Sequence, residues 1–193
     1  MPRPSLKNQR RTLILDAYGK CIARFGVEGA TLEKTAEEAG LARALIRHNV
    51  GNKDDLLDAF LEQFLTQSAK NTATLFDALP EKNRVQTLVD WLFEGTFADS
   101  GRINITNALL IAASDNPQLA KKLKGWTQDF IDRIRGELTQ AYPKTEGDKL
   151  DAVAVGIAAI FLNFDTLSPI GSLDNLQQSS KTATKMLIAS LEG

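Results

Sequence analysis

Apolar residues recur three and four positions apart along almost the whole chain, which is the spacing of one face of a helix. The first such segment runs from about Gln9 to Phe25, and Gly26 is expected to end it, because glycine tolerates the left-handed conformation found at helix ends. Its apolar stripe consists of Leu13, Ile14, Ala17, Cys21, Ile22 and Phe25. No convincing alternation of apolar and polar residues predicts a strand, so the pattern indicates an all-α protein of about nine helices.

Two short helices are predicted next. Thr31 suits the N-cap of the first, and Glu33 lies in its first turn, near the positive end of the helix dipole. Residues 40–42, Gly-Leu-Ala, are expected to form a tight turn. The second short helix then runs from about Arg43 to Asn49.

Capping residues mark where the longer helices begin. Asn52, followed by two carboxylates, predicts the start of a long helix that reaches about Ala78. Pro80 suits the first position of a following helix. Residues 99–101 are expected to break that segment.

The second half of the chain repeats these signals. Asn116 and Pro117 predict the start of a helix that reaches Ala141. Two more helices are expected at about residues 147–165 and 173–191. They complete a chain without internal repeats or low-complexity segments.

Charge is distributed unevenly between the two ends of the chain. The 193 residues carry 23 basic and 24 acidic side chains, a net charge of -1. Residues 1–53 hold 10 of the basic and 5 of the acidic groups, which leaves 13 basic and 19 acidic groups for the remainder. A basic first quarter joined to an acidic remainder favours a polyanion-binding head and a body with another task.

The residue counts exclude several kinds of site. A single cysteine, Cys21, excludes an intramolecular disulfide and a cysteine-based zinc site, and a single histidine, His48, excludes a histidine-rich metal site. We therefore expect no metal, no cofactor and no catalytic residue. No signal peptide is visible, and the longest apolar stretch, residues 152–162, is too short to span a bilayer, so we expect a cytoplasmic protein without a membrane partner.

Two short helices with a glycine between them are the pattern of a helix-turn-helix unit, whose second helix enters the major groove of DNA. Any two such helices can imitate this pattern, but the run from Thr31 to Leu56 is more specific. It resembles the DNA-binding domain of the tetracycline-repressor (TetR) family, which has a Thr-led second helix, Ala-Gly-Val-Ser at the turn, a Gly-x-Leu-Tyr-x-His-Phe recognition helix and then Ser/Asn-Lys-Glu-x-Leu. The motif resemblance covers about Arg10 to Leu57.

The resemblance implies a DNA-binding domain at residues 1–51, with its helix-turn-helix motif at 31–50, and a ligand-sensing and dimerisation domain at 52–193. The chain departs from the family pattern within the motif. The family's serine, glycine, tyrosine, histidine and aromatic residue are replaced by Ala42, Ala44, Arg47, Asn49 and Val50.

The recognition helix supplies the residues expected to contact DNA. Arg43 and Arg47 can bind phosphate or form a forked pair with guanine, although either could be a solvated surface charge. Lys53 lies beside a helix N-terminus, which suits a phosphate contact. Thr31 serves as a cap and could also touch phosphate. The candidate DNA-binding residues are Thr31, Lys34, Ala42, Arg43, Ala44, Arg47, His48 and Lys53.

The N-terminal segment is basic. Arg3, Lys7, Arg10 and Arg11 either enter a minor groove as a flexible arm or are disordered.

The segment from Leu150 to Phe164 is apolar almost all the way round, so its helix should be covered on more than one side. In the family that the head resembles, the last two helices pair with those of a second copy in a four-helix dimer interface. Dimerisation also doubles the base contacts of a small head on a palindrome. The candidate interface residues are Ala152, Gly156, Ala159, Ile160, Met186 and Leu187.

Large aromatic residues concentrate in the middle helices, and most are expected to be core. The family resemblance implies that some line a pocket for a small-molecule effector, which no motif identifies. The candidate ligand-binding residues are Phe64, Trp91, Asn107, Trp126, Phe130 and Phe161. The aromatic set also includes Phe60, Phe76, Phe93, Phe97 and Phe164.

The leading interpretation is a homodimeric, ligand-responsive transcriptional regulator of double-stranded DNA, most often a repressor in such a family. An enzyme is disfavoured because the single histidine lies in the recognition helix and no glycine-rich phosphate loop is present, although a metal-free carboxylate site stays open. A helical adaptor, or a ligand-binding protein that does not bind DNA, is the other alternative. The charge asymmetry argues against it.

Overall fold

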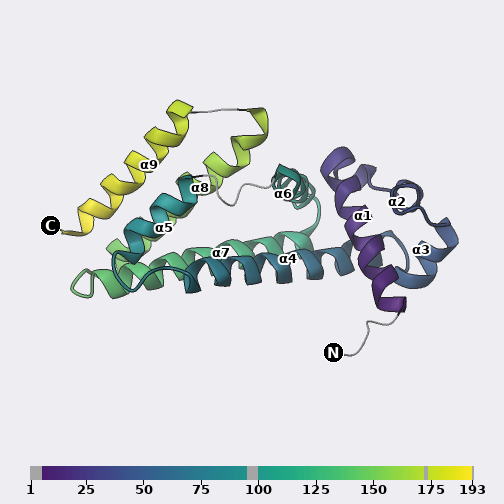
Figure 1. Ribbon diagram of the computed structural model, residues 1–193, viewed down its shortest axis with the longest axis horizontal. Helices are drawn as coiled ribbons and strands as arrows, with labels where there is room; N and C mark the ends of the chain where they lie inside the picture. Colours follow the sequence, from purple (N-terminus) through teal and green to yellow (C-terminus); the bar gives the residue numbers. More distant parts are fainter. Residues whose placement is uncertain (1–5, 95–99, 172–173, 193) are drawn as a thin grey trace. The chain divides into compact units, whose positions relative to one another are not determined.

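The computed structural model describes residues 6–94, 100–171 and 174–192 (Figure 1). Throughout these residues the ordered elements are helices and none is a strand, which confirms the predicted all-α class. In chain order they are α1 (Leu6–Gly29), α2 (Leu32–Ala39), α3 (Arg43–Val50), α4 (Lys53–Asp77), α5 (Arg84–Phe93), α6 (Ser100–Ala112), α7 (Pro117–Ala141), α8 (Gly147–Leu167), η1 (Ser168–Ile170), α9 (Asp174–Ala189) and η2 (Ser190–Glu192).

The chain divides into two compact units. The first unit comprises residues 1–69 and 104–121, and the second comprises residues 70–103 and 122–193. The predicted DNA-binding domain, residues 1–51, lies within the first unit, which also includes the first part of α4 and most of α6. The sequence boundary at residue 51 stays a prediction about function.

The core of the first unit forms where α1 packs against α2 and α3. The α1 side chains that pack into it are Ile14, Leu15, Ala17, Tyr18, Cys21 and Ile22. Leu13 and Phe25, predicted on the apolar stripe, are instead 47% and 44% exposed. Leu13 lies at one edge of the stripe, whereas Phe25 lies in its last turn, where the cationic groups of Lys34 and Arg24 lie over the ring.

Local capping signals mark several helix ends as predicted. Gly26 interrupts α1 with φ 71°, a conformation open to glycine. Asn116 Oδ1 accepts a hydrogen bond from the Leu119 amide at 3.0 Å, and α7 begins at Pro117, as predicted. These ends depend on contacts within one turn of helix, so the sequence specifies them directly.

The second unit has one continuous apolar core. Its fully buried members from α5 and α7 are Val85, Leu88, Val89, Leu92, Phe93, Ile134 and Leu138. From α8 and the C-terminal segment they are Leu150, Val153, Ala154, Ile157, Ala158, Ile188 and Leu191.

Two predicted boundaries in this region are wrong. α5 begins at Arg84 rather than at Pro80, because the chain turns through Asn83 in a left-handed conformation with φ 58°. Arg84 then donates hydrogen bonds back to the carbonyl of Phe76, in the last turn of α4, and to that of Leu79, just after α4. α6 begins at Ser100, so Ser100 and Gly101 start a helix instead of breaking one, and Asp99 lies outside the described residues.

The last two helices agree with the predicted segments. α8 ends at Leu167, η1 follows, and Gly171 with φ 111° precedes the residues that lead to α9. The segment 147–170 is long and apolar enough to cross a membrane by length and composition, with mean hydropathy 1.7. The prediction that the apolar stretch is too short therefore underestimated this helix. One such helix is weak evidence for a membrane span, because core helices of soluble proteins pass the same test.

Candidate nucleic-acid interface

α2 and α3 are joined by the tight turn that the sequence predicts. The Thr31 Oγ1 accepts a hydrogen bond from the Lys34 amide at 3.3 Å, so Thr31 caps α2. Gly40 ends α2 in the left-handed conformation, with φ 64° and ψ 32°. α3 follows Ala42, whose side chain makes no capping hydrogen bond. The two helices form a helix-turn-helix unit.

α3 has one buried face and one exposed face. Ile46 and Val50 are buried and anchor the helix in the first unit. The exposed side chains are those of Arg43, Ala44, Arg47 and His48, preceded by exposed Ala42. Because residues four positions apart lie on one side of a helix, the exposed residues form a continuous basic surface.

The two arginines of this surface differ in their partners. Arg43 Nη1 lies 2.8 Å from Glu33 Oε1, and both side chains are more than half exposed. Arg47 has no ion pair or hydrogen bond through its side chain to any residue that the structure describes, and the same holds for His48. The sequence did not single out Glu33 as a partner, because the ten positions between Glu33 and Arg43 follow no helical spacing.

The two candidate lysines already have intramolecular partners. Lys34 Nζ lies 4.0 Å from the centre of the Phe25 ring, a cation–π contact. Lys53 Nζ lies 2.8 Å from Glu28 Oε2 and donates a hydrogen bond to the Glu28 carbonyl at 3.2 Å. A phosphate must therefore compete with Glu28 for the ammonium group of Lys53.

The first amides of α4 are also engaged. Asn52 Oδ1 accepts hydrogen bonds from the amides of Asp54 and Asp55 at 2.8 and 3.0 Å, and Asp55 Oδ2 accepts one from the Asn52 amide at 2.9 Å. This reciprocal capping confirms the predicted helix start. It also occupies two of the amides at the helix N-terminus beside Lys53.

Most of the basic N-terminal segment is helical. Lys7, Arg10 and Arg11 lie in the first turns of α1 and are exposed, so at these positions the segment is ordered. Arg3 lies outside the described residues.

The second unit contains a contiguous cluster of phenylalanine rings. The ring centres of Phe76 and Phe130 are 6.5 Å apart, and those of Phe130 and Phe161 are 5.7 Å apart. Phe93 extends the cluster, 6.2 Å from Phe161 and 5.6 Å from Phe164. These distances are those of interacting aromatic pairs, and the cluster is continuous with the apolar core.

The candidate ligand-binding residues divide between the two units. Trp91, Phe130 and Phe161 are half-buried against the core of the second unit, and Trp126 is half-buried on α7. Phe64 and Asn107 belong to the first unit, where the Phe64 ring stacks on Phe60 with 5.9 Å between centres. Phe97 lies outside the described residues.

A polar pair of the second unit involves α6 and α8. Arg102 Nη2 lies 3.4 Å from Asp165 Oδ2, and both side chains are largely buried. Burial raises the pKa of the Asp165 carboxyl, while Arg102 acts in the opposite direction. Asp165 therefore retains a proton more readily than an exposed aspartate.

A groove of about 670 Å³ lies at the junction of α7 and α8. Its lining contains none of the six candidate ligand-binding residues. The lining residues are Ala141, Tyr142, Pro143, Lys144, Thr145, Glu146, Lys149, Leu191 and Glu192. Among the described residues no group of three or more His, Cys, Asp or Glu side chains could hold a metal ion.

The candidate dimer residues do not share one environment. Ala152, Ala159 and Met186 are exposed. Gly156 instead faces α9 of its own chain, where a Cβ atom would lie 2.8 Å from Leu187 Cδ1. Ile160 packs against the core of the second unit.

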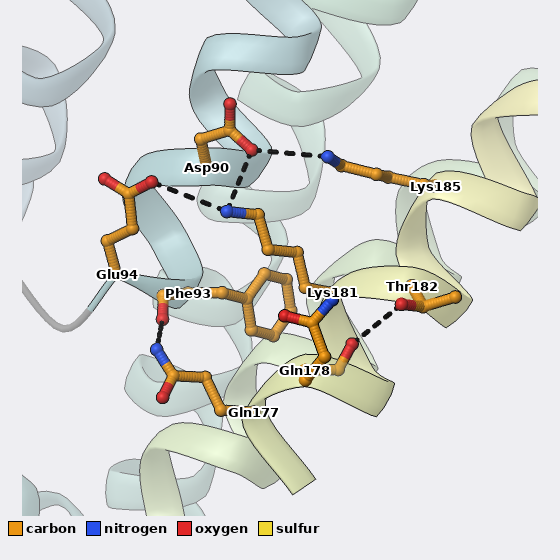
Figure 2. A network of polar contacts seen from close by, with 8 residues as sticks. All are labelled: Asp90, Phe93, Glu94, Gln177, Gln178, Lys181, Thr182 and Lys185. Carbon is orange, nitrogen blue, oxygen red and sulfur yellow. Dashed lines mark hydrogen bonds and ion pairs between the residues drawn. The ribbon is translucent and has the colours of Figure 1, made fainter. Parts of the chain in front are cut away.

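Polar contacts connect α9 to the C-terminal half of α5 (Figure 2). Lys181 Nζ lies 3.0 Å from Asp90 Oδ1 and 3.4 Å from Glu94 Oε1, and Lys185 Nζ lies 3.5 Å from Asp90 Oδ1. Gln177 donates a hydrogen bond to the Phe93 carbonyl. These contacts place two cations beside the negative end of the α5 dipole.

Comparisons with known proteins agree with this architecture. No protein-family model matches the chain. The chain is 25% identical to the HTH-type transcriptional regulator BetI of Vibrio vulnificus over 163 residues, covering 83% of this chain and 81% of that protein. It is 23% identical to the protein of that name from Escherichia coli O17:K52:H18, covering 83% and 82%.

Solved structures share the fold. A TetR-family transcriptional regulator from Streptomyces coelicolor superposes with a TM-score of 0.78 at 14% identity, covering 99% of this chain and 98% of that one. The multidrug binding protein EbrR, in complex with imidazole, superposes with a TM-score of 0.64 at 21% identity, covering 96% of both chains. The chain thus has the fold of solved TetR-family transcriptional regulators, and its sequence is similar to those of HTH-type transcriptional regulators.

Proposed function

We propose that this protein is a DNA-binding transcriptional regulator of the TetR family. In this proposal it is a homodimeric repressor that binds a palindromic operator through α3 and leaves it when a small, largely apolar molecule binds its body. The observation that carries the proposal is the exposed face of α3, where Arg43, Arg47 and His48 lie together while Ile46 and Val50 hold the helix in the core. A rigid helix with basic residues on its outer face suits the major groove.

A gel-shift experiment tests the DNA-binding part. Duplexes selected from a randomised library serve as probe, and Arg43→Ala or Arg47→Ala should each cost about 1–3 kcal/mol if the arginine reads a base. Lys124→Ala removes one exposed cation of α7 and is the matched control, with binding expected to persist. If the double variant Arg43→Ala/Arg47→Ala binds as tightly as the wild type, α3 is not the recognition helix.

The exposed apolar residues of α8 and α9 support a homodimer. Ala152, Val155 and Ala159 follow one face of α8, and Met186 of α9 is 69% exposed. Burying such residues against a second copy removes apolar surface from water. Two heads on successive major grooves would then need half-site centres about 34–36 Å apart, or a small multiple of that distance.

The oligomeric state tests the homodimer. Ala159→Glu places a charge on the exposed face of α8 without touching the core of the protomer, so the variant should fold and become monomeric. Gly156→Glu is a poorer choice, because it would collide with Leu187 of the same chain. Ala78→Glu, at another exposed alanine, is the control. Light scattering that finds the wild type monomeric while it binds a palindrome at full affinity contradicts the dimer.

The effector part rests on the aromatic residues of the body. We propose a pocket in the second unit lined by some of Trp91, Trp126, Phe130 and Phe161. The phenylalanine cluster formed by Phe76, Phe130, Phe161, Phe93 and Phe164 supports an apolar effector. A ligand changes operator affinity only if it prefers the state that cannot bind DNA.

Tryptophan fluorescence and gel shifts test the effector together. A compound library is screened for a change in the emission of Trp91 and Trp126, and each hit is added at saturation to the operator complex. The coupling free energy between ligand binding and DNA binding is expected to be about 1–3 kcal/mol. Binding of DNA must then lower the affinity for the ligand by the same factor. A saturating ligand that leaves operator affinity unchanged contradicts the coupling.

The proposed function also implies where the protein acts and that it is not an enzyme. We propose that the protein acts in the cytoplasm, where a regulator of this family meets DNA. We assign it no catalytic residue, and the exposed apolar face of α8 goes to a second copy rather than to a membrane.

A further inference from the structure

Glu33 is an acidic residue on the surface that the proposed function places against DNA. It lies in the first turn of α2, its side chain is 57% exposed, and its Oε1 lies 2.8 Å from Arg43 Nη1. A carboxylate beside phosphates repels them and lowers affinity for every sequence. Its pairing with an arginine of the recognition helix indicates a second task.

Arg43 occupies the position from which a recognition helix reads bases. It is the first residue of α3, and the N-terminal residues of such helices contact base edges. The ion pair with Glu33 uses Nη1 of the guanidinium. It leaves Nε and Nη2 as two parallel donors, and a pair of parallel guanidinium donors matches O6 and N7 of guanine.

Arg47 offers a comparison within the same helix. It lies one turn after Arg43, is exposed, and has no partner among the described residues. An arginine without a fixed partner can follow phosphates in several orientations. An arginine held by a carboxylate loses less side-chain freedom when it meets one particular base.

We propose that Glu33 is a positioning residue that holds the Arg43 guanidinium with its Nε and Nη2 edge toward one guanine of each half-site. Glu33 thereby makes Arg43, rather than Arg47, the arginine that determines specificity. The inference rests on the proposed function and deepens it. Glu33 raises the ratio of the affinity for the operator to the affinity for unrelated DNA in two ways. It orients Arg43 for the base contact, and its negative charge weakens binding to unrelated DNA.

Selection from a randomised duplex library tests this inference, with the wild type and single variants compared base by base. Arg43→Ala should lose the preference for one guanine per half-site, a factor of about 5 to 150. Glu33→Gln should weaken the preference at that same position by about two- to fivefold, while its affinity for unrelated DNA rises.

Glu37→Gln is the matched control. Glu37 lies one turn further along α2, is exposed, and has no side-chain partner among the described residues, so the variant makes the same change of charge without touching Arg43. It should keep the base preference. The double variant Glu33→Gln/Arg43→Ala should match Arg43→Ala at that guanine, because Glu33 acts through Arg43. Equal circular dichroism spectra and melting temperatures exclude misfolding.

Several results would overturn the inference while DNA binding stands. Glu33→Gln could change affinity for all sequences by one factor and leave the preference intact, which is an electrostatic effect alone. Glu33→Gln could weaken the preference at a different base. In the double variant its effect on base preference could add to that of Arg43→Ala. Arg43→Ala could retain every preference while Arg47→Ala loses one. A wild-type protein that selects no sequence would overturn the proposed function and this inference together.

Discussion

The charged pairs of the two units are built differently. In the first unit Arg43–Glu33 and Lys53–Glu28 lie at the surface, with side-chain exposures of 62% and 57% in the former pair and 36% and 93% in the latter. In the second unit Arg84 forms a fork with Glu137, with Nε–Oε2 at 2.7 Å and Nη2–Oε1 at 2.8 Å. The Glu137 side chain is only 9% exposed.

This difference separates exchangeable charges from structural ones. An exposed ion pair contributes little to the free energy of unfolding, and its charged groups stay accessible from solvent. A shielded pair with two parallel hydrogen bonds holds its helices in place, because removing one partner strands the other away from water. The cations of the first unit thus stay accessible, while Arg84 of the second unit connects α4, α5 and α7.

The largest expected effect comes from breaking the shielded pair. Arg84→Ala leaves Glu137 buried without its partner and frees the carbonyls of Phe76 and Leu79, so it should lower the free energy of unfolding by about 3–5 kcal/mol in urea denaturation. Arg135→Ala is the control, because its pair with Asp151 is exposed and should contribute less than about 1 kcal/mol. Equal losses for the two variants would remove the distinction between the units.

A smaller effect is expected at the exposed pair of Lys53. If phosphate displaces Glu28, Lys53→Ala should weaken binding to all DNA sequences about equally. It should also make the slope of log affinity against log salt shallower by about 0.9. The free energy of unfolding should fall by less than about 1 kcal/mol.

Glu28→Gln sharpens this test, since it frees Lys53 and should raise affinity for all sequences. If Lys53→Ala leaves the slope of log affinity against log salt unchanged, Lys53 pairs with Glu28 and contacts no phosphate.

Lys181 is an intermediate case, 20% exposed between Asp90 and Glu94 (Figure 2). Lys181→Gln should cost about 0.5–1 kcal/mol at neutral pH, and Lys185→Gln, whose single contact is longer and more exposed, should cost less. The hydrogen bond to Asp90 raises the pKa of the Lys181 ammonium in the folded state above its ordinary value of 10.5.

The contribution of the charged Lys181 to the free energy of unfolding is therefore fully present below pH 10.5. It is lost as the pH rises through the raised pKa of Lys181 in the folded state. Denaturation of the wild type and Lys181→Gln at neutral pH and above pH 10.5 should show their difference narrowing. A difference that is constant with pH would mean that Lys181 acts through packing.

A small effect of opposite sign is expected at Tyr18, a buried polar group of the first unit. Tyr18 is fully buried against Phe60, and its hydroxyl has no hydrogen-bond partner among the described residues. Burial raises the pKa of the Tyr18 phenol, so it stays neutral. Tyr18→Phe should stabilise the protein slightly, by up to about 1 kcal/mol in thermal denaturation, because it removes an unsatisfied polar atom. A clear loss of stability would show that the hydroxyl is hydrogen-bonded.

The amino-acid sequence by itself determined the helix ends that depend on neighbours within one turn. The caps at Thr31, Asn52 and Asn116, the left-handed conformation of Gly26 and the turn that begins at Gly40 all lie where the sequence predicts them. The period of apolar residues likewise predicted an all-α chain. Capping and amphipathic spacing are local, so the sequence contains their whole cause.

Only the tertiary structure decided which charges meet. Arg43 with Glu33, Lys53 with Glu28 and Arg84 with Glu137 are separated by 10, 25 and 53 positions, and no helical spacing relates them. Packing also placed Gly156 against Leu187 of its own chain rather than on the exposed face. Such contacts depend on how whole helices pack in three dimensions, and a one-dimensional pattern of residue types does not contain that information.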